Sequence, residues 1–146
     1  MNKALSLAVA ATLSCASLNS EAQTMIGKTT DVAAIANGDR MNAETLWAMG
    51  RIGGAAASPD GKTVVYQVGY YSVKQNKSHQ MLYTVSADGK KQHSLTTTAA
   101  SETDATWIDG GKRIAFLTGG QLWTMNADGT DRRQLTKSEI DIEGYI

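Results

Sequence analysis

"SADGKKQHSLT", residues 86–96, returns forty residues later as "NADGTDRRQLT", residues 126–136. Each copy follows a run of apolar residues of the kind that favours β-strands. The Asp-Gly pair inside each copy favours a tight turn, because glycine adopts positive φ without steric cost. In a chain of 146 residues, a phrase that recurs in this way indicates a structural unit that is built twice.

The second copy predicts a unit of four short antiparallel strands. Its parts are "ATW" at 105–107, a hairpin over 113–118 and 121–126, and the returning strand "RRQLT". The first copy has the same parts in the same order: "AAAS" at 55–58, strands over 63–71 and 80–86, and "HSLT". About ten residues, "YYSVKQNKSH", are additional in the first copy. We expect them to lengthen its central hairpin at one rim.

Units of this kind are typical of β-propeller blades, which have four antiparallel strands in roughly 40 to 45 residues. Ile114 and Phe116 alternate with Ala115 and Leu117, so both faces of one strand are apolar, as expected where sheets stack on both sides. We therefore predict an all-β fold with two four-stranded antiparallel propeller blades and the start of a third. The alternative is two unrelated hairpins that share common turn residues.

A third unit is indicated by "SEID" at 138–141, which echoes "SETD" at 101–104. A closed propeller needs at least about four blades, so the sequence is expected to be part of a larger protein. With blades missing on both sides, we expect four apolar side chains to be exposed on one side and to favour association with other chains. They are Val64, Tyr66, Ile114 and Phe116.

The composition is that of a folded domain, with 42% hydrophobic residues and 14 basic against 14 acidic side chains. A formal net charge of zero, without a basic stripe or an acidic tail, argues against disorder and against nucleic-acid binding. Fourteen glycines, one proline and few aromatic residues fit short strands joined by tight turns better than a helical bundle.

The first 22 residues predict a secretory signal peptide. Lys3 gives a positive start, Ala4–Leu18 is almost wholly apolar or small, and Ser20 and Ala22 have the small side chains of a cleavage site before Gln23. The apolar run is shorter than the roughly 20 residues of a membrane-spanning helix. We therefore expect export to the periplasm, with cleavage after Ala22 and no membrane-spanning helix.

Cys15, the only cysteine, lies inside this segment. A lipoprotein that keeps Cys15 as an acylated first residue is the alternative, but "TLS" at 12–14 matches the usual small-residue lipobox poorly. Cleavage after Ala22 would leave the mature chain without disulfides or thiol catalysis.

The remaining chain divides by composition and pattern. Residues 23–40 are small and polar and are expected to form a loose leader, and 41–50 predict a short helix with Asn42 as N-cap and Gly50 as its end. The predicted blades follow at 51–98 and 99–137, and residues 138–146 would start the third blade.

The segments "MNAETLWAMGRIGGAAASPDGKTVVYQV" and "QLWTMNADGTDRRQLT" resemble the N-terminal propeller of prolyl oligopeptidase-family serine peptidases, in the acylaminoacyl-peptidase and secreted dipeptidyl-peptidase branch. The resemblance covers residues 41–146. It implies a propeller that caps an α/β-hydrolase domain with a Ser-Asp-His triad, in an enzyme that cleaves short peptides. The second blade departs from the family pattern, with "WIDGGK" in place of "WSPDGK".

No catalytic, cofactor-binding or metal-binding residue is predicted in this chain. The stretch 54–58 lacks the closing glycine of a Gly-x-Ser-x-Gly nucleophile elbow. The two histidines, His79 and His93, are expected to be solvated surface residues rather than members of a triad or zinc site.

Two other groups of residues raise the possibility of a binding site. The turn aspartates could suggest calcium, but each lacks the alternating acidic ligands of such loops and is expected to bond its own turn; they are Asp60, Asp88, Asp109 and Asp128. The tryptophans could stack a sugar or a peptide ring, but core packing is favoured; they are Trp47, Trp107 and Trp123.

Three functions are compatible with these patterns. The first is part of the substrate-gating propeller of an exported serine exopeptidase, not catalytic by itself and partnered by the missing hydrolase domain, the remaining blades and short peptides. The second is a TolB-like periplasmic propeller that acts as a protein-binding module, although such proteins carry an additional domain before their blades. The third is a structural or degenerate product without a role of its own.

Overall fold

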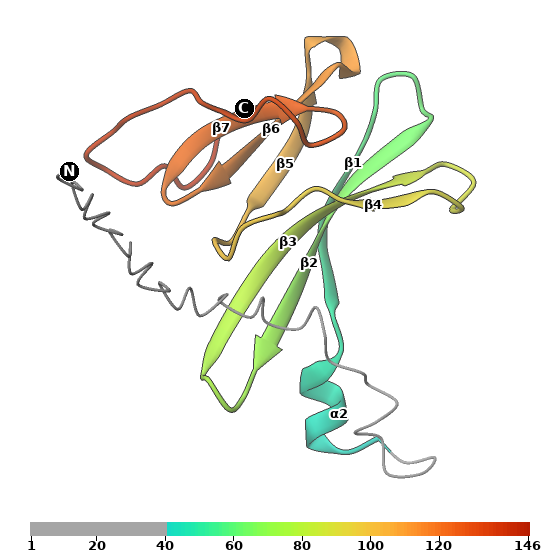
Figure 1. The fold of residues 1–146 in the computed structure, drawn as a ribbon, viewed down its shortest axis with the longest axis vertical. Coiled ribbons are helices and arrows are strands. Elements are labelled where there is room, and N and C mark those ends of the chain that lie inside the picture. Colours follow the sequence, from blue (N-terminus) through green and yellow to red (C-terminus); the bar gives the residue numbers. More distant parts are fainter. Residues whose placement is uncertain (1–40) are drawn as a thin grey trace, which may run out of the picture.

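The computed structural model describes residues 41–146, which form two four-stranded antiparallel β-sheets and one short helix (Figure 1). The predicted signal peptide, Cys15 and the leader 23–40 lie outside the described residues. Helix α2 spans Ala43–Ala48. Sheet 1 consists of β1 (Arg51–Ala57), β2 (Thr63–Ser72), β3 (Lys77–Ser86) and β4 (Gln92–Ser94). Sheet 2 consists of β5 (Thr103–Ile108), β6 (Arg113–Thr118), β7 (Gln121–Asn126) and β8 (Arg133–Gln134).

The strands of each sheet follow one another in sequence order, as the repeated pattern predicts. The predicted bounds of β6 and β7 agree with the structure, whereas β1 starts at Arg51, earlier than the predicted 55. Each first strand carries a register irregularity against its neighbour, between Ile52 and Ala55 in β1 and between Thr103 and Thr106 in β5. The mostly β architecture and the two four-stranded units are thus confirmed.

The repeated phrase corresponds to repeated hydrogen bonds. In sheet 1, the backbone N–H of Leu82 donates to the hydroxyl of Thr96 at 2.8 Å. In sheet 2, Leu122 makes the same bond to Thr136 at 2.9 Å, forty residues later. The Leu-Thr dipeptide that ends each unit therefore ties the outer edge of the sheet to its third strand.

The core lies between the two sheets. Its fully buried members are Val65, Leu82 and Leu95 from sheet 1 and Ile114, Phe116 and Met125 from sheet 2. Ile114 and Phe116 are both 0% exposed, so the expectation that they lose cover was wrong. The physical reason is orientation, because they point toward sheet 1 while their neighbours point away.

The opposite face of β6 is also covered. Ala115 and Leu117 are 3% and 5% exposed. The hydroxyl of Tyr145 donates to the backbone carbonyl of Ala115 at 2.8 Å, and the backbone N–H of Ile142 donates to the carbonyl of Gly120 at 2.9 Å. The segment after β8 therefore returns along sheet 2 and covers it (Figure 1).

A second apolar cluster lies on sheet 1 and contains Val68, Met81 and Tyr83. Tyr66 stacks on Tyr83 with a ring-centroid distance of 5.6 Å, and the hydroxyls of Tyr70 and Tyr83 are 3.2 Å apart. Val64 and Tyr66 are only partly buried, in agreement with the expectation of reduced cover on this sheet.

The central hairpin of sheet 1 is longer than that of sheet 2. Strands β2 and β3 have 10 residues each, whereas β6 and β7 have 6 each. The residues that the first copy has in addition therefore extend both strands and form a turn that ends at Asn76, with φ of 48°. This is the lengthened hairpin that the sequence predicts.

Helix α2 begins as predicted but ends differently. The side chain of Asn42 accepts a hydrogen bond from the backbone N–H of Thr45 at 2.7 Å, which is the expected N-cap. The helix ends at Ala48, its C-cap Met49 is extended, and Gly50 is not in the left-handed region. Gly50 is instead a point of close approach, because a Cβ there would lie 2.8 Å from the side chains of Tyr70 and Val68.

Substitution of Phe116 tests the inter-sheet core. Phe116→Ala is expected to lower the free energy of unfolding by about 3 to 5 kcal/mol, because it removes a fully buried ring and leaves a cavity between the sheets. Urea unfolding followed by circular dichroism measures the change. Val73→Ala is the control, since Val73 is 67% exposed and the change should stay within about 0.5 kcal/mol. Equal stabilities of the two variants would contradict the assignment of Phe116 to the core.

Candidate functional site

The structure separates the two histidines. His93, at the exposed outer strand β4, is solvated as predicted. His79 is only 2% exposed, so the prediction of a surface position was wrong. Its Nε2 lies 3.1 Å from the carbonyl oxygen of Ala100, because the segment that leads to sheet 2 covers the outer edge of β3. The histidines thus do not meet in a common site.

Glu102 and Arg132 form a buried charged cluster between the sheets. Glu102 is 1% exposed, pairs with the guanidinium of Arg132 and accepts a hydrogen bond from the hydroxyl of Thr96 at 2.8 Å. Arg132 also donates to the carbonyl of Leu95 at 3.2 Å and lies 4.8 Å from the ring centroid of Phe116. Burial raises the pKa of Glu102, whereas the bonds from Thr96 and Arg132 oppose the rise. The oxygens of Glu102 are engaged within the fold, so the cluster is structural.

Three of the four turn aspartates bond their own turns, as predicted. The Oδ1 atoms of Asp60, Asp88 and Asp128 accept from the backbone N–H two residues later at 3.0, 3.1 and 2.9 Å. Ser58 and Ser86 donate to the first two of these carboxylates at 2.6 and 2.5 Å. Sequence reasoning missed these serines, although each stands two residues before its aspartate.

Asp109 behaves differently and corrects the fourth prediction. It has a positive φ of 51° and begins the 3₁₀ turn η1 (Asp109–Gly111), and no hydrogen bond of its side chain to the turn is present among the described contacts. Gly110 and Gly111 follow at φ of 64° and 89°. The "WIDGGK" departure thus replaces a side-chain-bonded turn with a glycine-rich one.

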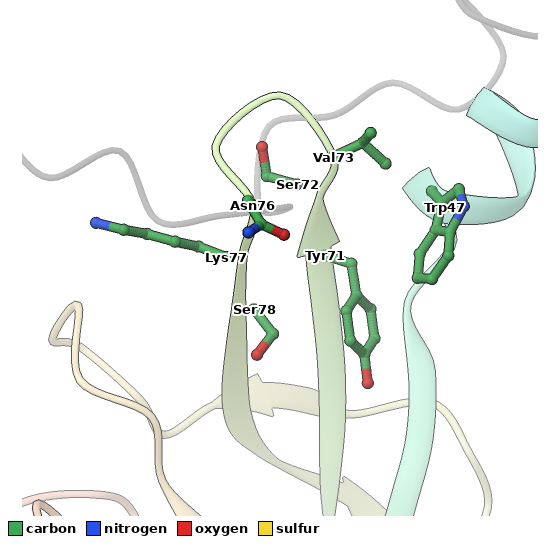
Figure 2. Close-up of a pocket in the computed structure, with 7 residues that line it drawn as sticks. All are labelled: Trp47, Tyr71, Ser72, Val73, Asn76, Lys77 and Ser78. Atoms are coloured by element: carbon green, nitrogen blue, oxygen red, sulfur yellow. The ribbon is translucent and has the colours of Figure 1, made fainter.

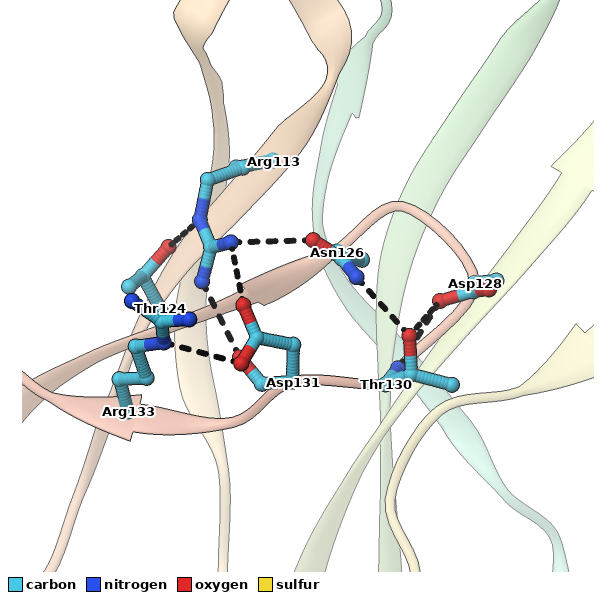
Figure 3. Close-up of polar contacts among 7 residues, drawn as sticks. All are labelled: Arg113, Thr124, Asn126, Asp128, Thr130, Asp131 and Arg133. Atoms are coloured by element: carbon cyan, nitrogen blue, oxygen red, sulfur yellow. Dashed lines mark hydrogen bonds and ion pairs between the residues drawn. The ribbon is translucent and has the colours of Figure 1, made fainter.

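Arg113 organises the polar surface at the end of sheet 2 (Figure 3). It donates to the hydroxyl of Thr124 at 3.1 Å and to the side-chain oxygen of Asn126 at 3.0 Å, and it pairs with Asp131 at 2.9 Å. The bonds from Arg113 and Arg133 hold the pKa of Asp131 below its usual range. These contacts fix the turn that places Arg132 over the core.

One candidate site is a groove of about 550 Å³ between the two sheets, at the rim of the Asp-Gly turns. Sheet 1 contributes the basic side chains of Lys91 and His93, and sheet 2 contributes Trp107 and Asp128. The groove carries both signs of charge in neighbouring positions. Within residues 41–146, no three His, Cys, Asp or Glu side chains are grouped so that they could hold a metal ion.

A second candidate site is a pocket of about 430 Å³ at the opposite rim, beside the long hairpin of sheet 1 (Figure 2). Trp47 is 43% exposed there and meets Tyr71 edge-on, with a ring-centroid distance of 5.8 Å. The prediction of core packing is confirmed for Trp107 and Trp123, which pack against the inter-sheet core. It was wrong for Trp47, because the hairpin extension offers this ring a surface outside the core.

Neither site contains a catalytic constellation. The two histidines of the described residues, one buried and one exposed, lie apart. Separately, none of the helices described in residues 41–146 has the length and apolar character that a lipid bilayer requires. What the sites offer is shaped surface with charged and aromatic side chains, which suits binding or steric selection.

Comparison with curated proteins finds relatives by sequence, although no protein-family model matches the chain. The chain is 42% identical over 110 residues to dipeptidyl-peptidase 5 of Porphyromonas endodontalis, a match that covers 73% of this chain and 16% of that protein. It is 39% identical over 87 residues to dipeptidyl-peptidase 5 of Porphyromonas gingivalis, and this match covers 58% of this chain and 13% of that protein. The chain therefore spans about one sixth or less of the relatives that it matches.

Solved structures show the same fold. The acylaminoacyl peptidase of Pyrococcus horikoshii matches 65% of this chain with a TM-score of 0.54 and 14% identity, over 15% of its own length. An acylaminoacyl peptidase in complex with Z-Gly-Gly-Phe-chloromethyl ketone matches 67% with a TM-score of 0.55 and 13% identity, over 16% of its length.

The turn carboxylates predict a dependence of stability on pH. Hydrogen bonds lower the pKa of Asp60, Asp88 and Asp128. A carboxyl group with a lowered pKa stabilises the fold fully above its unfolded pKa of about 3.9, and this contribution is lost as the pH falls through the folded value. Replacement of all three by Asn should therefore flatten the decrease in the free energy of unfolding below about pH 4.

Urea unfolding at a series of pH values from neutral to acid measures this slope. Glu139→Gln serves as the control, because Glu139 is exposed and lies outside these turns. The idea fails if the triple variant loses stability on acidification as steeply as the unchanged chain.

Proposed function

Because the chain is a relative of prolyl oligopeptidase-family peptidases, as its sequence predicted, we propose that its two sheets are neighbouring blades of the β-propeller of an exported serine exopeptidase. The observation that carries the proposal is the sequence relation to dipeptidyl-peptidase 5, which extends over 110 residues and 73% of this chain. The stacking of the two sheets through a shared core supports it, since propeller blades bury their faces against each other.

The proposed role is the gating of substrate by size. In a propeller the first strand of each blade lines the central channel, and β1 and β5, the first strands here, contact each other. The middle of β1 is exposed and carries the small residues Gly53, Gly54 and Ala55. A channel lined by such strands admits an extended peptide and excludes folded proteins.

We propose that this part of the enzyme does not catalyse hydrolysis itself. Acyl transfer by this family's chemistry needs a nucleophile, a base and an oxyanion hole in one place. Among the described residues, His79 is buried and His93 is exposed, and the two lie apart. The sequence has no Gly-x-Ser-x-Gly elbow. The chemistry is therefore assigned to a partner α/β-hydrolase domain.

Peptidase assays test this assignment. The purified 146-residue chain should release no p-nitroaniline from dipeptidyl p-nitroanilides, because it lacks the nucleophile. The genomic reading frame after the codon for Ile146 should encode further blades and a Gly-x-Ser-x-Gly motif, and its full product should be active. Activity of the short chain, or a reading frame that ends after the last blade as in a TolB-like protein, would overturn the proposal.

Export is tested at the N-terminus. If residues 1–22 act as a signal peptide, mass spectrometry of the extracytoplasmic product should find Gln23, in open or cyclised form, as the first residue. Retention of Met1 in that fraction, or an acylated Cys15 as first residue, would contradict cleavage after Ala22.

A further inference from the structure

One face of sheet 1 points away from the shared core. Because side chains alternate along a strand, the residues next to the core residue Val65 point to this face. It carries two cross-strand pairs of β2 and β3, which we call the outer face: Val64 with Val85 and Tyr66 with Tyr83. Three of the four are only partly buried, namely Val64, Tyr66 and Val85. Apolar surface therefore stays partly open on this side of sheet 1.

The same positions of sheet 2 form its contact with sheet 1. Phe116 stands 50 residues after Tyr66 and pairs with Trp123, just as Tyr66 pairs with Tyr83. Phe116 is 0% exposed in the core between the sheets, and Trp123 packs against that core. The outer face of sheet 1 is therefore the counterpart of a surface that is buried against another sheet in the same chain.

Ile52 extends this open surface at the start of β1. It pairs with Val68, which follows Tyr66 on the same face of β2, yet Ile52 is 74% exposed. Its counterpart 50 residues later is Glu102, which is 1% exposed in the contact between the sheets. Ile52 and the outer face thus form one apolar patch, and such a patch marks an interaction surface.

The patch is uncharged where its counterpart carries an ion pair. Between the sheets, Arg132 pairs with Glu102. In sheet 1, Gln92 stands 40 residues before Arg132, and Ile52 stands 50 residues before Glu102. The amide of Gln92 donates to the hydroxyl of Tyr66. A layer that packs here must itself be uncharged, since a buried charge without a partner is costly.

We propose that the outer face and Ile52 bind a further four-stranded sheet of the same repeat, carried by a longer form of this polypeptide. That sheet would offer the aliphatic surface that sheet 1 offers to sheet 2, formed there by Val65, Leu82 and Leu95. Two observations select this partner. The counterpart surface packs on such a sheet within the chain, and the chain spans about one sixth or less of its curated relatives. The existence of the longer polypeptide rests on the proposed function.

Cysteine labelling tests whether this surface is covered. Ile52→Cys is combined with Cys15→Ser, both in the 146-residue chain and in the longer product of the reading frame. Labelling of position 52 by a maleimide, followed by peptide mass spectrometry, should be at least about tenfold slower in the longer product, because burial limits access. Val73→Cys is the matched control, since Val73 is 67% exposed and should react equally in both. Equal rates at position 52 in the two proteins would overturn the proposal.

Photo-crosslinking identifies the partner. With p-benzoylphenylalanine in place of Tyr66, the longer product should form a crosslink within one molecule, to a four-stranded unit that ends in Leu-Thr. A crosslink to a second molecule or to a hydrolase domain contradicts the proposal, as does the absence of any crosslink.

A charge substitution tests the neutral contact. Ile52→Glu should lower the thermal midpoint of the longer product by several degrees, and addition of Gln92→Arg should restore most of the loss, because the two recreate the pair of Arg132 and Glu102. In the 146-residue chain, Ile52→Glu should leave the midpoint nearly unchanged, because the side chain is exposed. An equal effect in both proteins contradicts the contact.

These measurements need no catalysis. A longer product that protects position 52 but lacks peptidase activity would reject the proposed function and keep the partner sheet. An active product that leaves position 52 open to labelling would do the reverse.

Discussion

Neither sheet can bury both of its faces alone, and this constraint accounts for most of the structure. Each has apolar side chains on both faces of its central strands, so water is excluded only when another layer stacks on it. Phe116 and Leu82 meet in the shared core for this reason. A fully buried side chain of this size contributes about 1.5 to 3 kcal/mol, which makes the stacking, rather than any turn, the main source of stability.

The buried pair of Glu102 and Arg132 adds specificity to this apolar contact. Desolvation of two charges offsets much of their attraction, so such a pair is weak as a source of stability. It does restrict how the sheets can slide, because Arg132 must reach the carbonyl of Leu95 in sheet 1 and Glu102 at the same time.

The two repeats are alike at one rim of the sheets and differ at the other. At the rim of the Asp-Gly turns, Asp60, Asp88 and Asp128 repeat the same side-chain-to-backbone bond, which keeps the strand ends at constant spacing. At the opposite rim the hairpin of sheet 1 extends well past the length of its counterpart and supports α2 and the Trp47 pocket. Variation concentrated at one rim is how a repeated scaffold acquires an individual surface.

Local features could be predicted from the sequence because their causes are local. The strands β6 and β7, the N-cap at Asn42 and the bonds of three turn aspartates depend on residues that are neighbours along the chain. The extended hairpin also followed, from the additional residues in the first copy. The family resemblance depended on the same repeated motifs.

Only the tertiary structure decided what each face meets. Alternation shows that Ile114 and Ala115 point in opposite directions, but the packing of sheet 1 and the returning segment with Tyr145 determines that both are buried. His79 is polar in a polar stretch and is buried because residues around Ala100 cross over it, while Trp47 stays at the surface beside Tyr71. Burial is a property of which segments cross in space, and the order of residues by itself states only which side chains share a face.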